Sequence, residues 1–117
     1  MRERRKYVRM TTPLEVSYTV EGKEALPQKS TTKDISPDGV SFPVKEEIPK
    51  GSLLNINVKI PTRSDAVAIK AKVVWCGEGK DSCVVGLEFI HISEEAKQDF
   101  LQYLCNLMYS QLKNLNI

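Results

Sequence analysis

The sequence predicts a mainly β protein, a six-stranded antiparallel β-barrel that is followed by a C-terminal α-helix. Three observations support this fold class. Apolar and polar residues alternate in short runs between residues 13 and 92, which is the period of half-buried strands. Short turns separate these runs and leave no room for crossover helices, so the strands should be antiparallel and close into a barrel. After residue 92 the apolar period changes to that of a helix.

Six runs have the character of strands, and they cover residues 14–20, 29–35, 40–44, 53–60, 66–75 and 82–90. The first run shows the pattern clearly, because every second residue from Leu14 to Val20 is apolar. Pro43 lacks a backbone N–H, which places the third strand at an edge of the sheet or at a bulge. Gly86 in the last strand indicates a bulge or the close approach of another group.

The C-terminal segment is expected to form one helix of about 20 residues. Ser93 can cap its first turn, where Glu94 and Glu95 interact favourably with the helix dipole. The apolar stripe of this helix consists of Phe100, Leu101, Leu104, Cys105, Leu107, Met108, Leu112 and Leu115. Because the helix is longer than one end of a small barrel, its outer part either frays or provides a face for a second subunit, as in a homodimer, or for a partner protein.

The 117 residues are expected to form one domain, with a flexible basic arm at residues 1–12, the barrel at residues 13–92 and the helix at residues 93–117. Hydrophobic residues make up 41% and charged residues 27% of the chain, which is typical of a soluble globular protein. Its apolar runs are too short to span a membrane and no signal sequence is visible, so we expect a cytoplasmic location. The three cysteines lack Cys-x-x-Cys spacing, which favours reduced thiols over a disulfide framework or a zinc site.

Positive charge is concentrated at the N-terminus. Five basic residues against one glutamate give the first nine positions a charge of +4, whereas the whole chain carries +2. The basic residues are Arg2, Arg4, Arg5, Lys6 and Arg9. A cationic arm on a mildly acidic body indicates an anionic partner for the arm, although a solvated arm without a partner is the alternative.

The stretch DISPDG, residues 34–39, raises the question of a metal or ligand site. Oxygen ligands at alternate positions followed by a glycine resemble the start of a calcium-binding EF-hand loop. That loop requires a carboxylate at its twelfth position, which here is Lys45, and helices on both sides, where this sequence predicts strands. The stretch is therefore expected to be a tight turn, in which Asp34 and Ser36 hydrogen-bond nearby backbone and Gly39 adopts a positive φ.

Two motifs occur together in this chain. Arg5 and Arg9 form R-x-x-x-R, directly preceded by Arg4, and the motif D-x-S-x-x-G begins at Asp34. With the later segments VVW and VGLEFIHIS and the terminal helix, the segments RRKYVR and KDISPDGVSF resemble the PilZ domain family over about residues 4–110. PilZ domains are bacterial receptors for the second messenger cyclic di-GMP. The resemblance implies a receptor that is not an enzyme and that has cyclic di-GMP, rather than a metal or another cofactor, as its ligand.

The resemblance assigns the ligand contacts to Arg4, Arg5, Arg9, Asp34, Ser36 and Gly39. Guanidinium forks match phosphates and the O6/N7 edge of guanine, and a carboxylate can accept hydrogen bonds from the N–H groups of its Watson–Crick edge. Trp75 stands where some PilZ domains carry an aromatic residue that stacks on a base, but its phase in the strand also fits a core residue. Arg4 implies two ligand molecules per protomer, because an arginine directly before R-x-x-x-R accompanies the dimeric ligand in the family.

We expect the arginine arm to be mobile without ligand and to fold onto the barrel around it, which would change the surface shown to an unidentified effector protein. Two other functions stay open. Small barrels with basic arms also bind single-stranded nucleic acid, but here the basic excess is confined to the first nine residues. A PilZ fold that does not bind the ligand would act only as an adaptor, and the intact motifs argue against this. With one histidine and no nucleophile motif, the chain is poorly equipped for catalysis.

Overall fold

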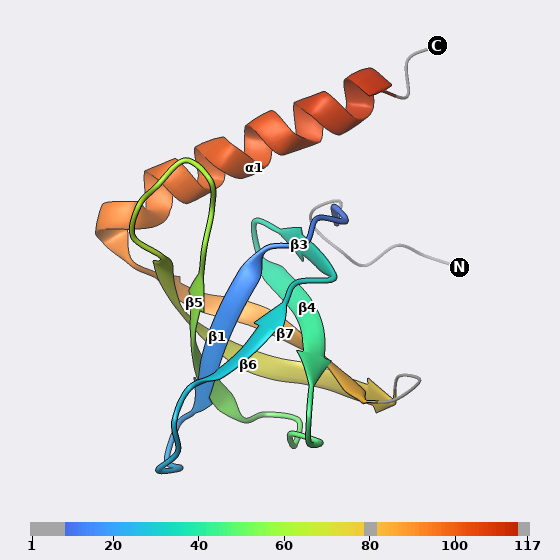
Figure 1. The fold of residues 1–117 in the computed structure, drawn as a ribbon, viewed down its shortest axis with the longest axis vertical. Coiled ribbons are helices and arrows are strands. Elements are labelled where there is room, and N and C mark those ends of the chain that lie inside the picture. The colour runs from blue at the N-terminus through green and yellow to red at the C-terminus, as the bar shows by residue number, and fades with distance from the viewer. Residues whose placement is uncertain (1–8, 79–81, 115–117) are drawn as a thin grey trace.

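The computed structural model describes residues 9–78 and 82–114, which form one antiparallel sheet and one helix (Figure 1). The elements are β1 (Glu15–Val20), β2 (Gln28–Thr31), β3 (Asp34–Ser36), β4 (Gly39–Val44), β5 (Leu53–Val58), β6 (Val67–Glu78), β7 (Cys83–Ile92) and α1 (Glu94–Asn114). The mainly β fold class and the C-terminal helix are therefore confirmed.

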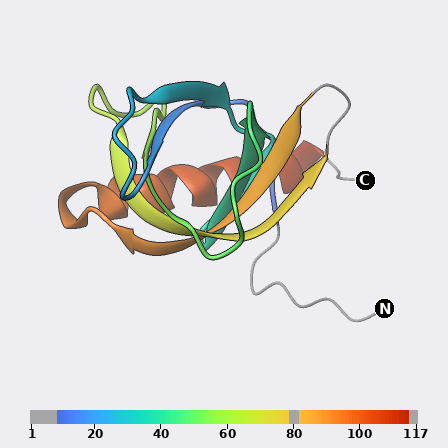
Figure 2. The ribbon, with the colours of Figure 1, turned by 90° about the horizontal axis from the view of Figure 1, so that it is seen from below.

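The predicted closed barrel of six strands is wrong. The sheet has seven strands in the order β2-β1-β5-β6-β7-β4-β3, and its two outer strands are not paired with each other. It curls strongly into an open half-barrel, which is visible when the molecule is viewed from below (Figure 2). The outer strands β2 and β3 are consecutive in the chain. The two edges of the half-barrel therefore come together at the short segment that connects β2 to β3.

The expected single strand at residues 29–35 is divided because the chain changes its pairing partner at Thr32. The backbone N–H of Thr32 donates to the carbonyl of Leu14, at 2.9 Å, which continues the contact with β1. The next N–H, that of Lys33, donates at 2.8 Å to the carbonyl of Ser41 in β4. The Thr32 hydroxyl is buried at this break, where it donates to the carbonyl of Thr12 and accepts from the N–H of Leu14. One hydroxyl thus supports the switch between β2 and β3.

Pro43 does not place β4 at an edge of the sheet, because β4 lies between β7 and β3. Within β4, the three residues of β3 pair with Gly39, Val40 and Ser41, so Pro43 lies beyond the end of β3. On that side its carbonyl accepts a hydrogen bond from the hydroxyl of Ser30 in β2, at 2.6 Å. The N–H that proline lacks therefore has no strand partner to lose at this position.

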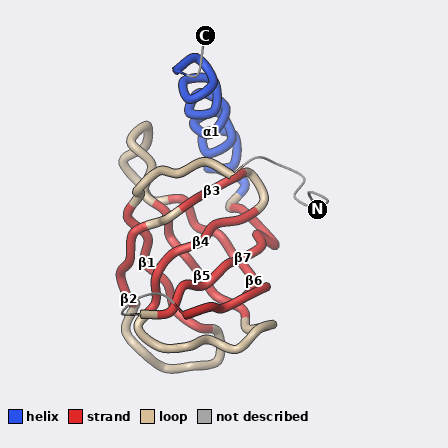
Figure 3. Tube along the Cα trace, turned by 90° about the vertical axis from the view of Figure 1, so that its right-hand side faces the viewer, coloured by secondary structure: helices blue, strands red, loops and turns tan. Residues whose placement is uncertain are grey.

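The core fills the inside of the half-barrel with alternate residues of the long strands, as the apolar periodicity predicts. Helix α1 lies at one end of the half-barrel (Figure 3). Its residues Ala96, Phe100 and Leu104 are buried in the core. Phe100 makes an edge contact with Phe89 of β7, with ring centroids 5.9 Å apart.

The outer part of the predicted apolar stripe of α1 is not used in the core. Leu101 and Leu107 are half-buried against it, whereas Met108 and Leu112 are exposed. Leu115 lies outside the described residues. In the part of the chain that the structure describes, no helix is long and apolar enough to cross a membrane.

Candidate functional site

The D-x-S-x-x-G motif forms a two-residue hairpin between β3 and β4, in which Ser36 pairs with Gly39. The Ser36 hydroxyl donates to the carboxylate of Asp38 at 2.6 Å and accepts from the Asp38 N–H at 3.3 Å. The carbonyl of Asp38 accepts from the N–H of Phe89 in β7 at 2.8 Å, which ties the turn to the sheet. Ser36 is fully buried, so its hydroxyl acts as the internal brace of this turn. This agrees with the local bracing role predicted for Ser36.

Gly39 does not have the positive φ that the sequence predicts, since positive φ among the described residues occurs only at Gly22 and Gly51. Glycine is needed at this position because there is no room for a side chain. A Cβ atom at position 39 would lie 2.5 Å from the backbone carbonyl oxygen of Leu87 in β7. Only glycine lets β4 approach β7 this closely at the start of the hairpin.

Asp34 does not bind its own turn but pairs with Arg9 of the R-x-x-x-R motif. The Arg9 Nη1 atom donates to Asp34 Oδ1 at 3.0 Å, and the two side chains are 18% and 29% exposed. The backbone sets up this contact, because Met10 and Ile35 exchange two hydrogen bonds of 2.8 and 2.9 Å. Met10 is buried, so the described end of the arm is attached to the hairpin beside the aspartate. The structure thus brings one residue of each motif together.

Arg4 and Arg5 lie outside the described residues. The predicted folding of the arm onto the barrel around the ligand therefore stays a prediction.

Four residues form one row across neighbouring strands on the outside of the half-barrel. Asp34 is paired with Ser41, Ser41 with Gly86, and Gly86 with Trp75. Directly opposite residues in antiparallel strands have their side chains on the same face. The row therefore connects Asp34, the predicted ligand-binding aspartate, to Trp75, the predicted stacking residue. It crosses the four neighbouring strands β3, β4, β7 and β6.

Trp75 belongs to this outer row and not to the core, since the residue is 42% exposed. A shift in the β6–β7 register between Val73 and Trp75 changes the strand phase, which is why alternation alone cannot decide the direction of the indole. The indole lies over Gly86, where an added Cβ would be only 2.1 Å from the ring atom Cε2. The predicted close approach at Gly86 is confirmed, and the approaching group is Trp75.

Ser41 is the residue of this row that the sequence analysis missed. The signal was present in the hairpin itself: if Ser36 pairs with Gly39, Asp34 must pair with Ser41 two positions further along. Two buried side-chain atoms have no hydrogen-bond partner among the described residues, and they are the Ser41 Oγ and the Arg9 Nε. Both belong to residues that neighbour Asp34.

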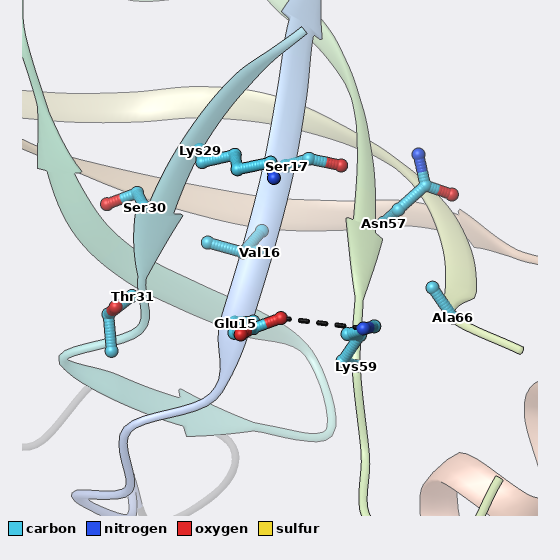
Figure 4. A pocket seen from close by; sticks show the side chains of 9 residues that line it. All are labelled: Glu15, Val16, Ser17, Lys29, Ser30, Thr31, Asn57, Lys59 and Ala66. Atoms are coloured by element: carbon cyan, nitrogen blue, oxygen red, sulfur yellow. Dashed lines mark ion pairs between the residues drawn. The ribbon is translucent and has the colours of Figure 1, made fainter. Parts of the chain in front are cut away.

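A separate cavity of about 550 Å³ lies over β1, β2 and β5 (Figure 4). Its lining consists of Glu15, Val16, Ser17, Lys29, Ser30, Thr31, Asn57, Lys59 and Ala66. The only ion pair drawn there joins Glu15 and Lys59, at 3.6 Å, and both of these side chains are exposed. No residue predicted for the ligand site lines this cavity, and the row from Asp34 to Trp75 remains the candidate site. Within the described ranges, no cluster of three or more His, Cys, Asp or Glu residues could hold a metal ion.

Comparison with known proteins gives both a family and a fold. The model of the PilZ domain family matches residues 3–105 of the chain. Among solved structures, Bacillus subtilis inhibitor of motility (MotI/DgrA) has a TM-score of 0.77 at 21% identity, and the match covers 97% of this chain and 54% of that one. This chain therefore spans about half the length of MotI/DgrA. No curated protein sequence matches the chain.

Two further similar structures are complexes with c-di-GMP. The PilZ domain of YcgR from Escherichia coli with c-di-GMP has a TM-score of 0.68 at 15% identity, covering 96% of this chain and 97% of that one. PlzA from Borreliella burgdorferi in complex with c-di-GMP has a TM-score of 0.56 at 12% identity, covering 96% and 53% of the two chains. At these identities the likeness shows the fold, whereas the family model spans nearly the whole sequence. On that match, the chain belongs to the PilZ domain family.

Proposed function

We propose that this protein is a receptor for cyclic di-GMP and acts without catalysis. The observation that carries the proposal is the contact between Arg9 and Asp34, at 3.0 Å. It joins the R-x-x-x-R and D-x-S-x-x-G motifs, which are 25 positions apart in the sequence, at one place on the half-barrel. Membership of the PilZ family and the complexes of YcgR and PlzA with c-di-GMP support the choice of ligand.

The chemistry of the pair suits a guanine nucleotide. The Asp34 carboxylate can accept hydrogen bonds from N1–H and N2–H₂ of guanine, and the Arg9 guanidinium can bind a phosphate or the O6/N7 edge. In the free protein these two groups neutralise each other, since Arg9 donates to Asp34. Ligand binding would replace or share this contact, so that neither charge is left unpaired in a partly buried position.

The outward position of Trp75 supports the stacking role over the core role. Its indole lies in the same outer row as Asp34, and 42% of its surface is exposed. An aromatic ring in this place can stack on one base while Asp34 binds a base edge. We propose Trp75 as the stacking residue of the site, together with the contacts assigned to Arg4, Arg5, Arg9, Asp34, Ser36 and Gly39. For Ser36 and Gly39 we propose a role in shaping the hairpin around the ligand.

The arm and the partners complete the proposal. Arg4 and Arg5 would close over the bound nucleotide, and Arg4 would favour two ligand molecules per protomer. Ordering of the arm would then change the surface that an effector protein contacts. The exposed outer part of α1, which includes Met108 and Leu112, is the proposed face for a homodimer.

Calorimetric titration of the whole protein with cyclic di-GMP tests the proposal. We expect saturable binding, with no comparable heat from single-stranded DNA of matched phosphate concentration. Binding of single-stranded DNA without binding of cyclic di-GMP would favour the nucleic-acid alternative. If the folded protein binds neither at high micromolar concentration, the receptor function is wrong and a role as an adaptor becomes the better hypothesis.

A further inference from the structure

We propose that the Ser41 hydroxyl makes a further hydrogen bond to the nucleotide, between Asp34 and Trp75. The inference rests on the proposed cyclic di-GMP site and adds a residue that lies outside both of its motifs. It would make Ser41 a ligand-binding residue rather than a structural one.

The strand register places Ser41 inside the site. Ser41 pairs with Asp34 on one side and with Gly86 on the other, so its side chain lies on the same face as the carboxylate. Trp75 covers Gly86 from the next strand, since its ring occupies the place that a Cβ on Gly86 would take. A nucleotide that contacts the Asp34 carboxylate and stacks on the Trp75 indole would have to pass over Ser41.

The hydrogen bonds of the buried polar residues set Ser41 apart. Among the described residues, three polar or charged residues are buried, namely Thr32, Ser36 and Ser41. The Thr32 hydroxyl bonds to Thr12 and Leu14, and the Ser36 hydroxyl bonds to Asp38. Ser41 is only 1% exposed, yet its hydroxyl has no partner within the described part of the chain. Its two counterparts support the fold, whereas Ser41 contributes no such bond.

An unpaired buried hydroxyl destabilises the free protein, because it has given up water without gaining a protein partner. An alanine would fill nearly the same space without this penalty. The Nε atom of Arg9 is also buried, and it too has no partner among the residues that the structure describes. Unpaired polar atoms on two neighbours of Asp34 are expected where a polar ligand completes the hydrogen bonds. The Trp75 indole is partly exposed, so it can move to give the ligand access to Ser41.

The test compares Ser41→Ala with Ser17→Ala. Ser17 is a half-buried serine of β1 that lines the separate cavity over β1, β2 and β5. For each variant of the whole chain, affinity for cyclic di-GMP is measured by calorimetry, and the free energy of unfolding without ligand is measured by urea denaturation. We expect Ser41→Ala to weaken binding roughly three- to tenfold, as for one neutral hydrogen bond, while the free protein stays at least as stable as wild type. Ser17→Ala should leave the affinity unchanged.

Each other result overturns the inference. Unchanged affinity of Ser41→Ala in a wild type that binds would show that the hydroxyl does not contact the ligand. A clear loss of stability in the free Ser41→Ala protein would show that the hydroxyl is already bonded in the fold, and this would refute the proposal whatever the affinity does. If the wild type itself does not bind cyclic di-GMP, the proposed function fails, and with it the role of Ser41.

Discussion

The guanidinium of Arg9 and the carboxylate of Asp34 lie 3.0 Å apart, although 25 positions separate them in the chain. The two backbone hydrogen bonds between Met10 and Ile35, the residues that directly follow them, hold the segments side by side. A contact between charged side chains that are mostly buried is less screened by solvent than a surface pair, and each partner depends on the other. We therefore base the first prediction on this pair.

Replacing Arg9 or Asp34 by alanine should weaken the binding of cyclic di-GMP about tenfold to 150-fold, the range expected when one charge-assisted hydrogen bond is lost. Arg5→Ala should act in the same direction. Arg63 provides a matched control, because its side chain is also largely buried and forms an ion pair of 2.8 Å with Asp99 of α1, outside the row. Calorimetry on all variants, with circular dichroism to verify folding, makes the comparison. Equal losses of affinity in Arg9→Ala and Arg63→Ala would contradict a specific role for Arg9.

Gly39→Ala should destabilise the protein by about 1–3 kcal/mol, as overpacking against a fixed neighbour does. The added Cβ would lie 2.5 Å from the Leu87 carbonyl oxygen, which is backbone and cannot rotate away. Gly77→Ala is the control, because Gly77 also lies in a strand but its added Cβ would have no neighbour within 4 Å. Urea denaturation gives both free energies of unfolding. A Gly39→Ala protein as stable as Gly77→Ala would show that the hairpin can relax away from β7.

Gly86→Ala should displace the Trp75 indole, because the new Cβ would overlap the ring. Trp75 is the single tryptophan of the chain, so its fluorescence reports this movement directly. We expect a changed emission spectrum in the free variant and weaker binding of cyclic di-GMP. Trp75→Ala should remove a stacking contribution of about 1–3 kcal/mol, whereas Trp75→Phe should retain part of it. Unaltered affinity in both Gly86→Ala and Trp75→Ala would exclude the indole from the site.

Arg4→Leu should reduce the number of bound ligand molecules from two per protomer to one. Two stacked cyclic dinucleotides bring four phosphates together, and an additional planar cation beside them stabilises that arrangement. Titration at protein concentrations well above the dissociation constant gives the ratio directly. Arg2→Leu removes the same charge from the arm outside the motif and serves as the control. A wild-type ratio of one, unchanged in Arg4→Leu, would leave Arg4 as an ordinary basic residue of the arm.

The Cys83 thiol should react slowly with alkylating reagents at neutral pH. Burial raises its pKa, and the charges of neighbouring Cys76, Glu47 and Glu78 raise the pKa further. Since the thiolate is the reactive form, the rate of alkylation should increase only as the pH passes this raised pKa. Cys76→Ser should lower the pKa and move the rate profile to lower pH. Mass spectrometry of the Cys83 peptide measures the rate, and identical profiles in the two proteins would rule out an effect of Cys76.

The apolar alternation predicted most elements well, because burial of alternate residues is a local property of each strand. The runs expected at residues 53–60 and 66–75 correspond to β5 and β6, although β6 continues to Glu78. The number of strands could not be predicted in the same way. Thr32 looks like any β-branched strand residue in the sequence. Only the backbone hydrogen bonds, from Thr32 N–H to Leu14 and from Lys33 N–H to Ser41, show that the chain changes partner there.

The sequence by itself determined the two motifs, the order of apolar strands and the helix at the end, since each is a pattern among residues close together in the chain. The tertiary structure decided what the side chains do. Three features depend on how separate segments pair: the contact of Arg9 with Asp34, the outward indole of Trp75, and the Ser41 hydroxyl, which has no partner among the described residues. A shift of one residue in any of these registers would move every following side chain to the other face of the sheet. Alternation alone does not specify that register, and for this reason the row from Asp34 to Trp75 becomes visible only when the strands are assembled.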